Sequence, residues 1–192
     1  MKLFFLRHTS LEVEVDTFYG QTDLDVSETF ESEVKNIKKK ISSNNINLEN
    51  LKIYTSPLKR CLKLTQKISN KYKKDDRLKE MNLGDWEMKK MSSISSKQKV
   101  DWENNLLSFK IPNGESNQMF LSRLNNFLED VIKNDNDVFI VCHAGSINGM
   151  ISILTGEPFK ELVKNYWEKI RYGSLSIIEI KNGLVLDKKI GI

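Results

Sequence analysis

The sequence predicts an α/β fold, a three-layer α/β/α sandwich with a mostly parallel, mixed central sheet and a small helical cap. Short apolar runs of strand length alternate with amphipathic helical patterns along the chain. Two of these runs, residues 3–6 and 138–142, are apolar throughout, which is typical of strands buried on both faces. The last two strand patterns flank Lys181-Asn182-Gly183, a hairpin signal that adds antiparallel pairing. The length of 192 residues suits a single domain, residues 1–192, with the cap inserted at about residues 88–112.

The predicted helices and strands each follow from a local pattern. Apolar residues that recur every three or four positions indicate the helices, and short apolar runs indicate the strands. We expect Ser27 to cap the first helix, Pro57 after Ser56 to begin the second, and Gly156 to end the fourth. The predicted strands are residues 3–6, 51–54, 138–142, 175–180 and 184–189, and the predicted helices are residues 30–41, 57–68, 119–131, 147–154 and 159–167.

Two segments lack a sustained period. Residues 11–26 form a long polar stretch, and a loop of this length inside a compact domain is usually functional or mobile. Residues 88–112 are rich in Met, Ser and Lys, and we expect them to form the short helices of the cap. Their apolar anchors are expected to be Trp102, Leu106, Leu107 and Phe109.

Composition and charge exclude several classes of partner. The formal net charge is +4, but the lysines are interleaved with Asp, Glu and Asn, and we expect blocks such as residues 38–40 and 71–74 to be solvated helix faces. No aromatic or Gly-rich recognition element accompanies them, so we expect no nucleic-acid partner. No apolar stretch is long enough to span a bilayer, so we expect no membrane partner. Cys61 and Cys142, without a CxxC pair, suit a reducing compartment, and we expect a cytoplasmic monomer or homodimer.

The residues that end the strands indicate an anion site. His8 and His143 are the only histidines, and each directly follows an apolar strand. Arg7 precedes the first, and Arg60 lies in the first turn of the helix after the second strand. Because ligands of open α/β sheets bind outside the carboxyl ends of the strands, these four side chains share one edge. Two arginines and two histidines together suit a dianionic phosphoryl group.

Phosphoryl chemistry then suggests a role for each group. A neutral imidazole at His8 can attack phosphorus and form a phosphohistidine, while Arg7, Arg60 and His143 neutralise the equatorial oxygens. The leaving alkoxide needs a proton from an acid, which nearby phosphate oxygens can keep protonated. The best candidate is Glu80, in a loop that contains Gly84 and Trp86, and the alternatives are Asp85 and Glu87. We expect the substrate to be a small phosphorylated metabolite, and we expect no metal or other cofactor, because this chemistry requires none.

These residues resemble the motifs of the histidine phosphatase superfamily, which includes phosphoglycerate mutases. The matching stretches run in the family's order and are residues 6–9 (LRHT), 54–61 (YTSPLKRC), 80–87 (EMNLGDWE), 112–116 (PNGES) and 141–145 (VCHAG). The resemblance implies a three-layer fold, a phosphoryl-binding role for Arg60, a proton-donor role for Glu80 and a catalytic role for His143. It covers residues 3 to about 149.

Within the superfamily, residues 19–23 (YGQTD) and the compact size are most similar to the α-ribazole phosphatase branch. This resemblance implies hydrolysis of α-ribazole 5′-phosphate during cobalamin biosynthesis. We further expect the substrate to contact Ser10, Tyr19, Gln21, Thr22 and Ala144. The chain departs from the family pattern in having Thr9 where Gly is usual, and Ser10 and Glu14 where many relatives carry Glu and Asn.

Other functions fit the residues less well. A broad-specificity phosphatase of small metabolites and a phosphoglycerate mutase share the proposed mechanism, but the missing Asn argues against a mutase. A metal hydrolase lacks carboxylates spaced with either histidine as metal ligands. A Cys–His hydrolase fails because the adjacent Cys142 and His143 point to opposite faces of a strand. A non-catalytic phosphate-binding module of the same fold would be expected to have lost Arg7, Arg60 or a histidine.

Overall fold

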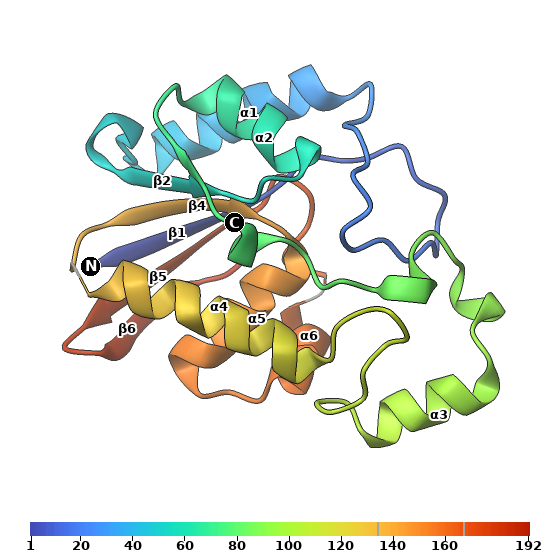
Figure 1. The fold of residues 1–192 in the computed structure, drawn as a ribbon. Coiled ribbons are helices and arrows are strands. Elements are labelled where there is room, and N and C mark those ends of the chain that lie inside the picture. Colours follow the sequence, from blue (N-terminus) through green and yellow to red (C-terminus); the bar gives the residue numbers. More distant parts are fainter. Residues whose placement is uncertain (134, 167) are drawn as a thin grey trace.

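The computed structural model describes residues 1–133, 135–166 and 168–192. A six-stranded sheet with the order β3-β2-β4-β1-β5-β6 forms the centre of the molecule (Figure 1). The strands β1 to β4 pair in parallel, whereas β5 is antiparallel to β1, and β6 to β5. The predicted mixed α/β fold is therefore confirmed. The strands are β1 (Lys2–Arg7), β2 (Lys52–Thr55), β3 (Lys73–Lys74), β4 (Val138–Cys142), β5 (Leu175–Lys181) and β6 (Leu184–Lys189).

Helices cover both faces of this sheet (Figure 1). One face packs against α1 (Phe30–Ser43) and α2 (Lys59–Ile68). The other packs against three helices: α4 (Asn117–Ile132), α5 (Ala144–Thr155) and α6 (Phe159–Tyr166). None of the helices that the structure describes is long and apolar enough to cross a membrane.

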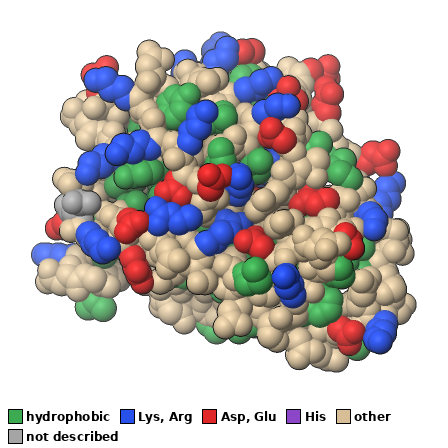
Figure 2. All heavy atoms as spheres, in the orientation of Figure 1, with side chains coloured by type: hydrophobic (Ala, Val, Ile, Leu, Met, Phe, Trp, Pro, Cys, Tyr) green, Lys and Arg blue, Asp and Glu red, His purple; other side chains and the backbone are tan. Residues whose placement is uncertain are grey.

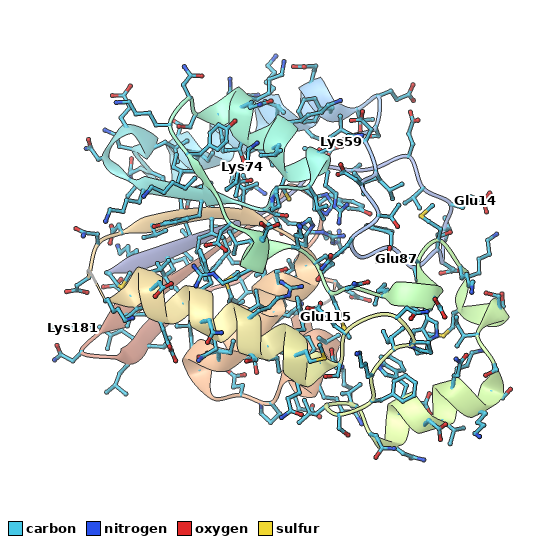
Figure 3. The ribbon with its side chains drawn as sticks, in the orientation of Figure 1. Glu14, Lys59, Lys74, Glu87, Glu115 and Lys181 are labelled. Carbon is cyan, nitrogen blue, oxygen red and sulfur yellow. The ribbon has the colours of Figure 1, made fainter. Side chains whose placement is uncertain are left out.

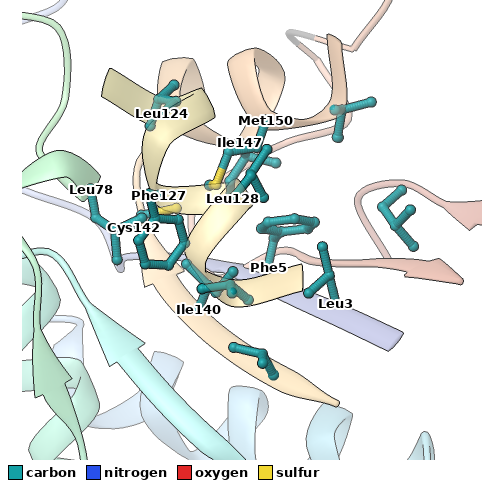
Figure 4. Packing of buried hydrophobic residues seen from close by; sticks show 14 of the residues in the cluster. Leu3, Phe5, Leu78, Leu124, Phe127, Leu128, Ile140, Cys142, Ile147 and Met150 are labelled. Carbon is teal, nitrogen blue, oxygen red and sulfur yellow. The ribbon is translucent and has the colours of Figure 1, made fainter. Parts of the chain in front are cut away.

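The alternation of side chains along β1 divides the core between the two faces. Phe4 and Leu6 join the cluster under α1 and α2, while Leu3 and Phe5 point the other way, toward α4 and α5 (Figure 4). All four side chains are at most 7% exposed. Burial on both faces explains why the run is apolar throughout, and it gives the residues at its end a rigid platform.

The loop of residues 11–26 packs against the segment 88–112, which contains α3 (Ser96–Asn104) (Figure 1). Phe18 exchanges two backbone hydrogen bonds with this segment: its N–H donates to the carbonyl of Lys89 at 2.8 Å, and its carbonyl accepts from Met88 at 2.7 Å. A satellite core below the loop consists of the buried Trp86, Ile94 and Ile111, with Phe18, Met81, Leu83, Trp102 and Phe109 packed against it.

Two predicted helix N-caps, Ser27 and Ser56, are wrong by two residues. The first helix, α1, begins at Phe30, and the Ser27 hydroxyl bonds to that of Thr29 instead of capping a helix. The second, α2, begins at Lys59 with Leu58 as its N-cap. Ser56 does accept a hydrogen bond from the Leu58 N–H at 3.4 Å, but the chain stays extended through Leu58.

Two smaller expectations also need correction, and a third extends outside the described residues. Lys73 and Lys74 form the exposed edge strand β3 and are not on a helix face. Leu107 is 54% exposed, so it does not anchor the segment 88–112; the buried anchors are Ile94 and Ile111. The periodicity of this short segment is too weak to reveal its inner face. The end of the helix predicted at residues 159–167 includes Trp167, which lies outside the described residues.

Candidate active site

Three parallel strands bring the predicted site residues together at their carboxyl ends. His8 follows β1, His143 follows β4, and Arg60 is the second residue of α2, the helix after β2. The two imidazole rings lie edge to face with their centroids 5.2 Å apart. His8 and His143 are each 1% exposed, and Arg60 is fully buried. These groups form a compact cluster below the surface.

Hydrogen bonds assign a tautomer to each histidine. The Nδ1–H of His8 donates to the carbonyl of Thr9 at 2.8 Å, which leaves the lone pair on Nε2. His143 has the opposite tautomer, since its Nδ1 accepts from the Nε–H of Arg60 at 3.2 Å. Its Nε2–H donates to the hydroxyl of Ser56 at 2.8 Å. His8 can thus act as a nucleophile through Nε2, while His143 presents a donor.

Burial keeps both rings neutral. It lowers the pKa of His8 well below the ordinary value of 6.5, and the positive charges of Arg7 and Arg60 lower it further. Burial also lowers the pKa of His143 well below that value, with additional contributions from Arg60 and His8. A nucleophilic imidazole must be unprotonated, so this environment suits phosphoryl transfer at neutral pH.

These shifts predict that the protein loses stability in acid. Below pH 6.5 the unfolded chain protonates both histidines while the folded protein does not, so the free energy of unfolding falls as the pH falls. Each histidine contributes up to about 1.4 kcal/mol per pH unit in this range. Urea denaturation at pH 7.5, 6.5 and 5.5 measures the slope. Replacing either histidine by asparagine should make the slope shallower, and an unchanged slope would contradict neutral burial.

The two arginines serve the site in different ways. Arg60 holds the loop of residues 11–26, because its Nη1 donates to the carbonyl of Thr22 at 2.9 Å and its Nη2 to that of Gly20 at 2.6 Å. Arg7 donates from Nη1 to the carbonyl of Ile170 at 2.7 Å. Its Nε is buried and has no hydrogen-bond partner among the described residues, so this N–H is available to an anion.

Glu80 lies at the N-terminus of α5, next to His143. Its Oε2 accepts from the backbone N–H of Gly145 at 2.9 Å, and its Oε1 accepts from that of Met81 at 3.0 Å. A Cβ atom on Gly145 would collide with Oε1, so glycine is required for this close approach. The helix terminus and the two amides hold the carboxyl group in one place.

The other two acid candidates are engaged elsewhere. Asp85 is exposed and accepts from Asn113 at 3.0 Å. Burial alone would raise the pKa of Glu87, but hydrogen bonds from Gly20, Thr22 and other donors outweigh it and lower this pKa. Glu87 is therefore an ionised structural group, and among the three candidates the geometry favours Glu80.

Glu87 also explains how two predicted contact residues are used. The Glu87 side chain is labelled in Figure 3. Its Oε2 accepts from the hydroxyl of Thr22 at 2.7 Å, and its Oε1 accepts from the backbone N–H of Gln21 at 2.8 Å. The Gln21 side chain donates to the carbonyl of Glu80 at 3.0 Å. Both side chains lie at the site, where they fasten the loop to the segment that carries Glu80.

The remaining predicted contact residues have different surroundings. Ala144 is the first residue of α5 and is 5% exposed. The backbone N–H of Ser10 donates to Glu33 at 3.0 Å. Tyr19 bonds through its hydroxyl to that of Tyr172, and burial followed by this bond raises its pKa. Glu14 lies outside this cluster, since it is 77% exposed and pairs with Lys90 at 2.8 Å.

Arg123 and Glu115 support the site, and sequence reasoning missed this function. Arg123 donates to the carbonyls of Lys79 at 2.7 Å and Glu80 at 2.8 Å, and its Nε donates to Glu115, labelled in Figure 3, at 2.8 Å. Glu115 in turn accepts from the backbone N–H of Asn82 at 2.8 Å. The pair holds the Glu80 loop by its backbone, and the available signal was that Arg123 is the one cationic residue between Asn117 and Ile132.

Among residues 1–133, 135–166 and 168–192, no group of three or more His, Cys, Asp or Glu side chains is arranged to hold a metal ion. Figure 2 shows that Lys and Arg are interspersed with Asp and Glu on the face it draws, without a continuous patch of one sign.

Comparisons with known proteins agree with the fold and the motifs. A structure of the alpha-ribazole phosphatase from Shigella flexneri is 22% identical, covers 100% of this chain and 96% of its own, and has a TM-score of 0.83. A structure from Escherichia coli K-12, provisionally named alpha-ribazole-5′-P phosphatase, is 19% identical, with coverages of 99% and 95% and a TM-score of 0.83. At these identities the similarity establishes the fold.

Sequence relatives point the same way. A protein of Hydrogenobacter thermophilus, provisionally named phosphoserine phosphatase 2, is 28% identical over 170 residues, which cover 84% of this chain and 82% of the relative. The sequence profile of the "Histidine phosphatase superfamily (branch 1)" matches residues 3–187. The chain is therefore a phosphatase enzyme that belongs to branch 1 of the histidine phosphatase superfamily.

Proposed function

We propose that this protein hydrolyses phosphate monoesters of small metabolites through a phosphohistidine on His8. The observation that carries the proposal is the neutral His8 ring, with its lone pair on Nε2 and two guanidinium groups beside it. A dianionic ester is attracted to Arg7 and Arg60, whose guanidinium groups stabilise the equatorial oxygens in the transition state. The Nε2–H of His143 joins them when it exchanges its hydrogen bond to Ser56 for one to a phosphoryl oxygen.

The reaction proceeds in two balanced steps. The lone pair of His8 Nε2 attacks phosphorus in line, the bond to the ester oxygen breaks, and Glu80 donates a proton to the departing alcohol. Water then attacks the phosphohistidine, the carboxylate of Glu80 accepts a proton from the water, and the P–N bond breaks. Inorganic phosphate leaves, and both side chains return to their starting states.

For the alcohol, we propose α-ribazole, so that the reaction serves cobalamin assembly. The support consists of the residues 19–23 and the names of the two structural relatives. The name of the Hydrogenobacter relative favours phosphoserine as a second candidate. We further propose that the enzyme acts in the cytoplasm without a metal ion, as a single domain with residues 88–112 as a cap.

A substrate panel tests these assignments. We expect the purified protein to hydrolyse p-nitrophenyl phosphate in the presence of EDTA, and to show its highest kcat/KM on α-ribazole 5′-phosphate. Phosphoserine and 3-phosphoglycerate complete the panel, and phosphate release is measured on all four. If kcat/KM is higher on phosphoserine than on α-ribazole 5′-phosphate, phosphoserine is the substrate and the α-ribazole assignment is wrong. Isomerisation of 3-phosphoglycerate without phosphate release would contradict hydrolysis.

A further inference from the structure

Two tyrosines from distant parts of the chain meet over the catalytic cluster. Tyr19 belongs to the loop of residues 11–26, and Tyr172 lies in the turn between α6 and β5; their hydroxyl groups are hydrogen-bonded. The Tyr172 ring stacks on Arg7, with the guanidinium carbon 4.0 Å from the ring centroid, and its centroid is 5.5 Å from that of His8. The Tyr19 ring lies 5.7 Å from the guanidinium carbon of Arg60. The pair thus spans both phosphoryl-binding arginines.

The tyrosine pair lies against the buried histidines. His8 and His143 are each 1% exposed, and the Tyr172 ring packs against His8 while its hydroxyl is bonded to that of Tyr19. We propose that Tyr19 and Tyr172 form a gate that the substrate must open, and that Tyr172 selects substrates by the chemistry of their alcohol. The inference rests on the proposed phosphatase reaction at His8 and identifies which esters that site accepts.

The surroundings indicate that the Tyr172 side chain is the moving half. Tyr19 directly precedes residues 20–22, which Glu87 and Arg60 hold by several hydrogen bonds. Tyr172 also lines a cavity of about 420 Å³, together with residues of the turn before β5 such as Arg171 and Ser174. Its backbone stays in place, because the N–H of Gly173 donates to the carbonyl of His8 at 3.0 Å. When the Tyr172 ring rotates away, Arg7 loses its stacking contact with that ring, and a bound phosphoryl group takes its place.

Opening the gate separates two phenolic hydroxyls, and each then needs a new partner. An alcohol that carries a hydroxyl or another hydrogen-bonding group near the ester oxygen supplies one. An apolar alcohol does not, so it leaves the phenols unpaired at the entrance. The expected preference is for phosphate esters of polyhydroxylated or similarly polar alcohols over those of apolar ones.

The test compares Tyr172→Phe and Tyr19→Phe with the wild-type protein on phenyl phosphate and glycerol 2-phosphate. Each substitution removes the bond that closes the gate, so KM for phenyl phosphate should fall about three- to tenfold. KM for glycerol 2-phosphate should stay constant or rise, because the variant also lacks the tyrosine hydroxyl with which the glycerol hydroxyls would form a hydrogen bond. The double variant should match the single ones on phenyl phosphate, since all three remove the same bond. A rise in KM for phenyl phosphate, or additive effects, would overturn the gate.

A matched control and a second measurement separate this inference from the proposed function. Tyr72→Phe also removes one phenol hydroxyl, which lies just before β3 and accepts a hydrogen bond from the Gln66 side chain, and it should leave both KM values unchanged. Orthovanadate binding, measured by calorimetry, should tighten in Tyr172→Phe by the same factor as KM falls. If the wild-type protein neither hydrolyses phenyl phosphate nor binds orthovanadate, the phosphatase reaction itself is refuted. Hydrolysis with equal KM values in all variants refutes only the gate.

Discussion

Alanine at position 8 is expected to lower kcat for every phosphate ester by about 10³-fold or more. His8 Nε2 carries the lone pair that attacks phosphorus, whereas the neighbouring His143 carries a proton on its Nε2. The Cys61 thiol lies 3.6 Å from the other histidine, but burial raises its pKa to about 12, so it remains a protonated, poor nucleophile. Steady-state phosphate release measures the loss.

The same variant should also fail to form a covalent intermediate. Rapid quenching of the wild-type protein during turnover, under alkaline conditions that preserve phosphohistidine, should show a phosphorylated peptide that contains His8. Cys61→Ser serves as the control and should still form this peptide. Phosphorylation of the chain in His8→Ala, or a peptide that maps to another residue, would contradict the assignment of the nucleophile.

The substitution Glu80→Gln is expected to lower kcat by about 10²- to 10⁴-fold for alkyl phosphates, whose leaving oxygens need a proton. The loss should be much smaller for p-nitrophenyl phosphate, because nitrophenolate leaves without one. The amide that replaces the carboxyl group can keep one contact with Gly145 but cannot donate an acidic proton. The decisive quantity is therefore the ratio of the two losses, which a general structural defect would not change.

Two further variants sharpen this experiment. Gly145→Ala keeps the carboxyl group of Glu80 but displaces it, since a Cβ would collide with Oε1. We expect kcat to fall more for alkyl phosphates than for p-nitrophenyl phosphate, as in Glu80→Gln, but by a smaller factor. Asp85→Asn is the matched control, as Asp85 is exposed and bonds to Asn113, and kcat should stay within about twofold. If Glu80→Gln lowers kcat by the same factor on alkyl phosphates and on p-nitrophenyl phosphate, Glu80 is not the acid that protonates the leaving group.

The sequence predicts the elements that depend on local patterns. The apolar run before His8 and the one before His143 each indicate a buried strand, and the order of strands and helices then brings their ends to one edge. The hairpin between β5 and β6 is likewise predictable, because an Asn-Gly pair readily adopts the positive φ angles that a tight hairpin turn needs. In the structure these angles are 53° at Asn182 and 76° at Gly183. In each case the signal lies within a few consecutive residues.

Contacts between distant segments leave no such signal. Ser56 matches a helix cap in sequence, yet its hydroxyl accepts from His143, 87 residues away. Tyr172 lies in a short turn without a pattern, and its partner Tyr19 is 153 residues away. Arg123 supports the Glu80 loop through backbone carbonyls, which every residue possesses. Such side-chain directions follow from packing in three dimensions, so they could not be derived from periodicity or composition.

The carboxylate of Glu87 joins the loop of residues 11–26 to the chain just before residues 88–112. It binds the loop that carries Tyr19, and the same loop exchanges backbone hydrogen bonds with Met88 and Lys89. A change in the segment 88–112 therefore shifts the entrance residues without altering the histidines or arginines that perform the chemistry. Substrate preference can drift, or be engineered, through positions that never touch a substrate, while the reaction itself is preserved.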